Sequence, residues 1–244
     1  MTDDATDSAV ALKRAAAARA LEFVSDGMKI GLGSGTTAEV FLELLGARVR
    51  GGLNIVGVPT SERIAQKART LGIALANLND VAPLDLDIDG ADEVDRDLDL
   101  IKGGGGALMR EKIVAVSSRR MIVIVDGSKL VPRLGVFPLP VEVLEFGHAT
   151  TAAQLAARVA EIGYPGVLVT LRQKNGAVFR TDNGNVIYDC GFGSIADPAE
   201  LSLALSSLTG VVDHGLYVGI AATVVVARDS GVEIIERAGR VAKA

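Results

Sequence analysis

The sequence predicts an α/β fold with a doubly wound, mostly parallel sheet and a small inserted α+β domain. Two observations support this prediction. Up to residue 125, apolar runs of about five residues alternate with helical segments of roughly 10 to 15 residues, which is typical of parallel strands joined by helical crossovers. After residues 137–140 (Phe-Pro-Leu-Pro), shorter strands surround two helices, which is typical of an α+β unit.

The first half of the chain supplies the elements of the parallel sheet. An Ala-rich segment opens the chain, with apolar residues at helical spacing. The strands that follow are rich in apolar and β-branched residues, and a sheet covered by helices on both faces buries such strands. The expected helices are 7–25, 37–48, 61–71 and 107–118, and the expected strands are 28–32, 54–58, 73–76, 84–88 and 121–125.

The second half supplies the smaller domain and then returns to the sheet. We expect strands at 141–143, 167–171 and 186–188 and helices at 151–162 and 198–208. A long apolar run from Leu216 to Ala227 is expected to form one strand that rejoins the first sheet, followed by a short strand at 232–237. The expected domains are a Rossmann-like catalytic domain over 1–137 and 213–244, and a small lid or oligomerisation domain over 138–212.

Composition and charge exclude several classes of function. The formal net charge is −5 and no long run of Lys or Arg occurs, so the chain has no general attraction for nucleic acid or an anionic membrane. The single cysteine, Cys190, excludes an intrachain disulfide and a cysteine-based zinc site. No apolar run approaches the roughly 20 residues of a membrane span, and the acidic N-terminus does not resemble a signal peptide. We therefore expect a cytoplasmic protein.

The first glycine-rich loop, residues 31–37 (Gly-Leu-Gly-Ser-Gly-Thr-Thr), joins a strand to a helix. Its glycines allow close approach of the backbone to a ligand, and the helix start offers N–H groups to an anion. The loop is either a phosphate or sugar cradle or a tight turn with Thr caps. A dinucleotide fingerprint and a nucleotide P-loop both fit poorly, because a third glycine and a Gly-Lys pair are missing. The candidate ligand residues are Ser34, Gly35, Thr36 and Thr37.

An acidic loop, residues 87–93 (Asp-Ile-Asp-Gly-Ala-Asp-Glu), follows another strand. Its Asp-Gly pair is compatible with a simple turn, and its acids are compatible with a metal site, although their spacing is not that of an EF-hand. Carboxylates that bind sugar hydroxyls or move their protons are equally natural here. The candidate residues are Asp89, Gly90, Ala91 and Asp92.

Four consecutive glycines at 103–106 lie between Lys102 and Glu111. Ordering such a run has a high cost in conformational entropy, so we expect its backbone to make a close contact with a ligand. The alternative is a flexible loop followed by ordinary surface charges at Glu111 and Lys112 on the next helix. Lys129 follows the strand at 121–125 and offers a second cation. The chain thus combines glycines, hydroxyls, lysines and carboxylates without a Cys nucleophile, a His base or a metal cluster, an inventory suited to acid–base chemistry on a phosphorylated polyol.

In these segments the chain resembles ribose-5-phosphate isomerase of the A type. The resemblance covers nearly the whole chain, in order, and its motifs are specific when taken together. Two departures are visible: Ser34 stands where Thr is common, and Met109 stands where Thr is often found. The matching segments are 31–37, 89–93, 102–105, 110–112, 126–129, 137–143 and 181–185.

The resemblance implies an aldose–ketose isomerase that interconverts D-ribose 5-phosphate and D-ribulose 5-phosphate through an enediolate, in the non-oxidative branch of the pentose phosphate pathway. It implies no metal or organic cofactor, and a homodimer or homotetramer. Glu111 takes the place of the family's proton acceptor, with Asp89, Asp92 and Lys102 as its catalytic neighbours. Substrate contacts are implied at Ser34, Gly35, Thr36, Thr37, Asp89, Gly90, Ala91, Asp92, Lys102, Gly103, Gly104, Gly105 and Lys129.

Two other functions share part of this pattern. The first is another sugar-phosphate isomerase or an amino-sugar-phosphate deaminase on a related fold. Such deaminases resemble the chain mainly in the first glycine-rich loop, but the chain lacks a His near its candidate base. A non-catalytic sugar-phosphate sensor would keep the phosphate loop without needing Glu111, and no DNA-binding appendage is evident. We expect His148, His214 and Cys190 to be structural.

Overall fold

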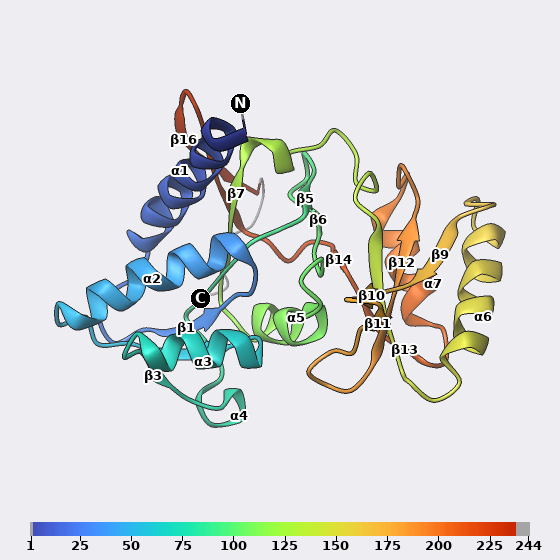
Figure 1. Ribbon diagram of the computed structural model, residues 1–244, viewed down its shortest axis with the longest axis horizontal. Coiled ribbons are helices and arrows are strands. Elements are labelled where there is room, and N and C mark those ends of the chain that lie inside the picture. Colours follow the sequence, from blue (N-terminus) through green and yellow to red (C-terminus); the bar gives the residue numbers. More distant parts are fainter. Residues whose placement is uncertain (1, 238–244) are drawn as a thin grey trace. The chain divides into compact units, whose positions relative to one another are not determined.

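The computed structural model describes residues 2–237, which form two compact units. Unit 1 contains the chain up to Ala91, then Arg110–Leu130, then the chain from Gly219 onward. Unit 2 contains Asp92–Met109 and Val131–Val218. Figure 1 shows the chain as a ribbon, with labels on many of its helices and strands. No helix among the described residues is long and apolar enough to cross a membrane.

Unit 1 is built on a seven-stranded sheet in the order β16-β15-β7-β4-β1-β2-β3. Neighbouring strands pair in parallel, except that β16 runs antiparallel to β15. The predicted α/β fold with a mostly parallel sheet is therefore confirmed. The strands are β1 (Lys29–Leu32), β2 (Val56–Pro59), β3 (Ala74–Leu75), β4 (Leu86–Asp89), β7 (Met121–Asp126), β15 (Thr223–Arg228) and β16 (Gly231–Glu236).

Helices cover both faces of this sheet. On one face, alternate strand residues such as Ile30, Leu32 and Ile88 pack into a core with residues of the first three helices. On the other face, Val114 of the fifth helix packs with Val58 and Leu84. The helices are α1 (Thr2–Leu21), α2 (Thr36–Arg50), α3 (Glu62–Thr70), α4 (Leu78–Val81) and α5 (Leu108–Val116), and a 3₁₀ turn, η1 (Gly127–Lys129), follows β7.

Strands β1 and β4 mark the point where the strand order reverses. The chain passes from β1 outward to β2 and β3, and it continues from β4 on the other side of β1 toward β7 and β15. Gly31 is in register with Asp87, and Leu32 with Ile88. In open parallel sheets a ligand binds beyond the carboxyl ends of the strands at such a reversal. In this sheet, the first glycine-rich loop and the acidic loop follow those two strand ends.

Unit 2 is an α+β unit with its own core. Its antiparallel sheet has the order β13-β8-β12-β9, and Val141, Val143 and Tyr188 pack into a core with the two helices. In Figure 1, α6 is drawn in yellow and α7 in orange. The elements are β8 (Leu139–Val143), α6 (His148–Glu161), β9 (Leu168–Leu171), β12 (Val186–Gly191), α7 (Pro198–Ser206) and β13 (Val211–His214), with a hairpin of β10 (Gln173–Lys174) and β11 (Ala177–Val178).

The expected single strand from Leu216 to Ala227 is wrong. The run forms two strands, β14 (Leu216–Tyr217) in unit 2 and β15 in unit 1, separated by a segment that includes Gly219 with φ +70°. A left-handed residue breaks an extended run, and glycine adopts that conformation without a steric penalty. Only the second of these strands joins the parallel sheet.

The compact units also have other boundaries than the expected domains. β14 pairs with β6 (Leu100–Ile101), and β6 pairs with β5 (Glu93–Val94), in a small antiparallel sheet. These pairings bring residues 92–109 into unit 2, although they precede the expected small domain by about 30 residues of sequence. The lid or oligomerisation role of the small domain stays a prediction.

Candidate active site

The first glycine-rich loop and the acidic loop touch each other in unit 1. A Cβ atom on Gly33 would lie 2.2 Å from the carboxyl carbon of Asp89 and 2.5 Å from its Cα atom. A Cβ atom on Gly31 would lie 2.5 Å from a carboxyl oxygen of Asp87 and 2.4 Å from Val114 of α5. No side chain fits in these distances, so glycine is required at 31 and 33 for β1, β4 and α5 to pack this closely.

The amino end of α2 begins at a glycine rather than at a residue with a capping side chain. Its N-cap residue, Gly35, has φ +102° and provides no side-chain cap. The first N–H groups of a helix lack partners within the helix and carry its positive dipole end. Thr36 and Thr37 stand at the first two positions of α2 and add hydroxyl groups there. This arrangement is that of an anion site.

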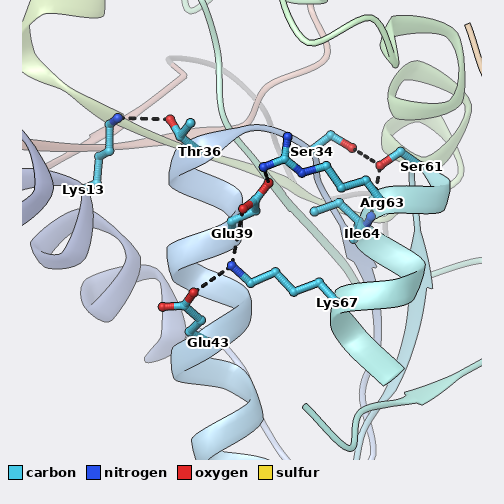
Figure 2. Close-up of polar contacts among 9 residues, drawn as sticks. All are labelled: Lys13, Ser34, Thr36, Glu39, Glu43, Ser61, Arg63, Ile64 and Lys67. Atoms are coloured by element: carbon cyan, nitrogen blue, oxygen red, sulfur yellow. Dashed lines mark hydrogen bonds and ion pairs between the residues drawn. The ribbon is translucent and has the colours of Figure 1, made fainter. Parts of the chain in front are cut away.

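The hydroxyl of Ser34 is fixed by the neighbouring loop. Ser34 Oγ lies 2.8 Å from Thr60 Oγ1 and 2.9 Å from Ser61 Oγ, and Thr60 Oγ1 donates to the Leu32 carbonyl. Ser61 also caps α3 by accepting from the N–H of Ile64, as Figure 2 shows. The loop after β2 therefore does cap the next helix, and it also supports the loop after β1.

Lys13 is a residue that the sequence reasoning missed. Its Nζ atom donates to Thr36 Oγ1 at 3.0 Å, which brings an ammonium group from α1 to the first residue of α2 (Figure 2). Lys13 lies in the Ala-rich first helix, 23 residues before its partner. Nothing in the local pattern distinguishes it from the adjacent Arg14.

Acidic residues on α2 are neutralised by α3. Glu39, in the first turn of α2, pairs with Arg63 at 2.6 Å and Lys67 at 3.3 Å, and Lys67 also bonds Glu43 at 2.7 Å (Figure 2). Although partial burial works in the opposite direction, the bonds to Glu43 and Glu39 raise the pKa of Lys67. Because its carboxylate is paired, Glu39 offsets little of the positive potential at the start of α2.

Glu111 is buried in the first turn of α5, with 4% of its surface exposed. The alternative of an ordinary surface charge at this position is therefore wrong. Val114, three residues further on and hence on the same side of the helix, contacts the Gly31 position of β1. Glu111 thus projects from the side of α5 that packs against the sheet. Asp89 of the same unit is fully buried as well, and buried carboxyl groups are frequent among the acids and bases of enzymes.

Two further residues hold the ends of the unit 1 loops. Arg110 donates to Glu62 at 3.0 Å, which ties α5 to the start of α3. Asp126 accepts from the N–H of Ser128 at 2.9 Å and so shapes the turn η1, which carries Lys129 directly after β7. The strands β1, β4 and β7 are neighbours in the sheet. The predicted site residues of unit 1 lie at or after their carboxyl ends: Ser34, Gly35, Thr36, Thr37, Asp89, Gly90, Ala91 and Lys129.

Unit 2 holds Asp92, Lys102 and the glycine run. Asp92 accepts from the N–H of Gly104 at 2.8 Å, and its own N–H donates to the Ile101 carbonyl. Lys102 is 3% exposed, and its Nζ atom lies 5.5 Å from the ring centroid of Tyr217. An aromatic face stabilises a desolvated ammonium group, so the Tyr217 ring is one of the groups that hold Lys102 in its buried position.

The glycine run has a defined conformation, which argues against a flexible loop. Gly103 and Gly106 have φ values of +105° and +86°, in the left-handed region. A Cβ atom on Gly104 would lie 2.8 Å from Asp92 and 2.9 Å from the Phe137 ring, whereas one on Gly105 would meet nothing within 4 Å. Three of the glycines are thus required by the fold, and Gly105 lies on the open side of the loop.

The described residues contain no group of three or more His, Cys, Asp and Glu side chains placed to hold a metal ion. His214 is buried, and its Nε2 atom lies 3.2 Å from the hydroxyls of Ser202 and Ser206. His148 Nδ1 lies 2.7 Å from the Tyr188 hydroxyl. Both contacts lie within unit 2 and are of the kind that supports packing.

A sequence model of ribose 5-phosphate isomerase A (phosphoriboisomerase A) matches residues 56–231. The chain belongs to the ribose 5-phosphate isomerase A family. Ribose-5-phosphate isomerase A of Parvibaculum lavamentivorans is 58% identical over 224 residues, covering 92% of this chain and 97% of the relative. That of Nitrobacter hamburgensis is 52% identical over 227 residues, covering 93% and 98%. The resemblance seen in the sequence motifs is thereby confirmed.

Solved structures agree with this family assignment. Ribose 5-phosphate isomerase from Plasmodium falciparum superimposes with a TM-score of 0.89 at 37% identity, covering 93% of this chain and 99% of that one. A D-ribose-5-phosphate isomerase in complex with phospho-erythronic acid has a TM-score of 0.87 at 37% identity, covering 94% and 99%. The isomerase fold therefore extends over nearly all of the chain.

Proposed function

We propose that this chain is a ribose-5-phosphate isomerase that interconverts D-ribose 5-phosphate and D-ribulose 5-phosphate. The names of relatives with 58% and 52% identity support this reaction. The observation that carries the proposal is the buried carboxyl of Glu111 at the start of α5, on the helix side that packs against β1. An isomerase needs a base held out of water near its substrate, whereas a sugar-phosphate sensor does not.

The proposed reaction begins with the acyclic aldose. The Glu111 carboxylate removes the proton from C2, and the electron pair forms the C1–C2 double bond while negative charge develops on O1. The resulting enediolate receives a proton at C1 from Glu111, and O2 loses its proton and becomes the ketose carbonyl. The exchange of protons between O1 and O2 is assigned to Asp89 and Asp92, and the same groups would assist ring opening.

Phosphate binding is assigned to the amino end of α2. The N–H groups of the helix start and the hydroxyls of Ser34, Thr36 and Thr37 suit a dianion. Lys13, bonded to Thr36 Oγ1 at 3.0 Å, supplies a local cation despite the net charge of −5. Lys129, on the turn after β7, is assigned the same role.

Stabilisation of the oxyanion is assigned to unit 2. Lys102 carries a buried ammonium whose neighbours include the Tyr217 ring, and the glycine run offers N–H groups beside it. Preorganised donors of this kind act most strongly where negative charge develops. We assign Gly103, Gly104 and Gly105 to backbone contacts with the substrate, together with Gly90 and Ala91 of unit 1.

A coupled assay tests the proposed reaction. The purified chain should convert ribose 5-phosphate to the ketose both with and without EDTA, and it should release no ammonia from an amino-sugar phosphate. Phospho-erythronic acid carries a carboxylate in place of the reacting carbons, so it should inhibit competitively. A chain that bound this acid but produced no ketose would be a sensor, and that result would overturn the proposal.

We also propose that the chain forms a homodimer or homotetramer, acts in the non-oxidative branch of the pentose phosphate pathway and resides in the cytoplasm. Exposed apolar side chains on unit 2 support the oligomer, because exposed apolar groups favour association. Phe146, Leu168 and Leu203 are 90%, 71% and 74% exposed. Sedimentation at micromolar concentration should give two or four times the mass of 25.2 kDa. The mass of a monomer would contradict the proposed oligomer.

A further inference from the structure

Arg172 is held on both sides within unit 2. It directly follows β9, and its side chain is 12% exposed. Its guanidinium forms a two-pronged ion pair with Asp189 of β12, with Nε donating to Oδ2 at 2.9 Å and Nη2 donating to Oδ1. On its other side, Nη1 donates to the carbonyl oxygens of Gly103 at 2.8 Å and Gly104 at 3.3 Å. A planar guanidinium with five donors can serve both partners at once.

These bonds fix the orientation of two peptide groups in the glycine run. In a trans peptide the N–H points away from the carbonyl of the preceding residue. The peptide between Gly103 and Gly104 directs its carbonyl to Arg172, and its N–H donates to Asp92 on the opposite side at 2.8 Å. The next peptide also directs its carbonyl to Arg172, so the Gly105 N–H must point away from the guanidinium.

The direction of the Gly105 N–H matters because that residue lies on the open side of the loop. A Cβ atom on Gly105 would meet nothing within 4 Å, whereas those on Gly103, Gly104 and Gly106 would collide with Leu108, Asp92 and Phe179. Glycine peptides have little intrinsic preference for one orientation. Without an external anchor, the peptide between Gly104 and Gly105 could turn its N–H away from a ligand.

We propose that Arg172 is a positioning residue for the isomerisation, holding the glycine run so that the Gly105 N–H donates to the oxyanion of the enediolate. This role rests on the proposed function and adds a residue that does not touch the substrate. Asp189 is the partner that fixes Arg172, because its carboxylate takes two donors of the guanidinium and leaves Nη1 for the loop.

Kinetics of three variants test this role. Arg172→Lys keeps the positive charge but cannot bridge Asp189 and two carbonyls at once, and Asp189→Asn keeps the shape but weakens the ion pair. Both should lower kcat by about 10-fold or more, with KM changed by less than about 3-fold, since loss of a preorganised oxyanion donor acts on the transition state. Arg180→Ala is the matched control, because this arginine of the same unit pairs with the exposed Glu145 and should leave kcat unchanged.

A chemical rescue separates positioning from stability. The activity lost in Arg172→Ala should be partly restored by methylguanidinium, which can occupy the vacated place between Asp189 and the glycine carbonyls, while Arg180→Ala should not respond. Thermal unfolding of each variant gives the folded fraction. A residue that served stability alone would lower that fraction and leave kcat per folded molecule unchanged.

The outcomes distinguish this role from the proposed function. If the unmodified chain isomerises ribose 5-phosphate but Arg172→Lys and Asp189→Asn keep kcat within about 2-fold, the positioning role is wrong and the isomerase assignment stands. If the unmodified chain shows no isomerase activity, the proposed function fails and this role fails with it. A selective loss of kcat with rescue by methylguanidinium supports both.

Discussion

Gly33 and Asp89 lie so close that a Cβ atom on residue 33 would be 2.2 Å from the Asp89 carboxyl carbon. The Gly33 N–H also donates to the carbonyl of Ile88 at 3.0 Å. The loop assigned to phosphate and the loop assigned to hydroxyl protons are therefore one packed assembly in unit 1. A side chain at residue 33 would therefore displace Asp89.

Replacing Gly33 by Ala tests this packing. The added methyl group cannot be accommodated without moving Asp89, so kcat/KM should fall by about 10²-fold while the variant still folds. Steady-state kinetics with circular dichroism give both quantities. Gly191→Ala is the control, because its Cβ atom would make only ordinary contacts at 3.9 Å. Near-normal activity of Gly33→Ala would contradict the close approach of the two loops.

Replacing Lys13 by Met tests the cation near α2. If Lys13 contributes one charged contact to the phosphate, KM for ribose 5-phosphate should rise by about 10-fold with a smaller change in kcat. Arg14→Met is the matched control, because Arg14 is the next cation on the same helix and its side chain is exposed. Equal effects of the two substitutions would show that only the general charge of α1 matters.

Cys190 should be inert in the folded chain. Burial, with a smaller effect of Asp189, raises the pKa of its thiol to about 12, so almost no thiolate forms at pH 8. A disulfide reagent at pH 8 should label the chain only after unfolding in guanidinium. Rapid labelling of the folded chain would contradict the burial of this thiol.

The same thiol gives a stability change at alkaline pH. The unfolded thiol loses its proton near its ordinary pKa of roughly 8.5, whereas the folded thiol keeps it up to about pH 12. The contribution of Cys190 to the free energy of unfolding is therefore fully present below the ordinary pKa of the thiol. It is lost as the pH rises from that value toward 12. Urea unfolding at pH 8 and pH 10.5 should show a fall in the free energy of unfolding that is smaller in Cys190→Ala. Equal falls in both chains would contradict the raised pKa.

Tyr217 should support the start of α5 through its hydroxyl. The buried phenol donates to the Leu108 carbonyl at 2.7 Å, and its ring lies beside Lys102. Tyr217→Phe removes the hydrogen bond and keeps the ring, so it should lower the free energy of unfolding by about 1 kcal/mol with little effect on kcat. Tyr217→Leu removes both contacts and should also reduce kcat. Identical kinetics for the two variants would show that the ring has no role in placing Lys102.

Most of the unit 1 fold could be predicted from the sequence because each strand is a continuous apolar run between helical segments. The strand that begins at Met121 is an example. The loops after β1 and β4 could be predicted because they directly follow such runs. The two-residue strands β5 and β6 could not be predicted, because two residues carry no periodicity. The break at Gly219 lies within an otherwise apolar run, so the sequence pattern predicts one long strand there.

The candidate site was only partly visible in the sequence. Glycines, hydroxyls and acids cluster at strand ends, and that clustering identified the loops that carry Ser34, Asp89 and Gly104. Lys13, Arg172 and Tyr217 reach their partners across 23, 69 and 109 residues. Only the tertiary fold brings such pairs together, so no local pattern could have found them.

The most direct test of the account measures proton transfer in Glu111→Gln. Ribose 5-phosphate is incubated in D₂O with the unmodified chain or with this variant, and nuclear magnetic resonance follows both the ketose formed and the deuterium incorporated at the reacting carbons. The unmodified chain should form ketose and exchange with solvent, and the variant should lose about 10²-fold or more in turnover and in exchange. A variant that kept turnover within about 10-fold of the unmodified chain would contradict the role of Glu111 as the base.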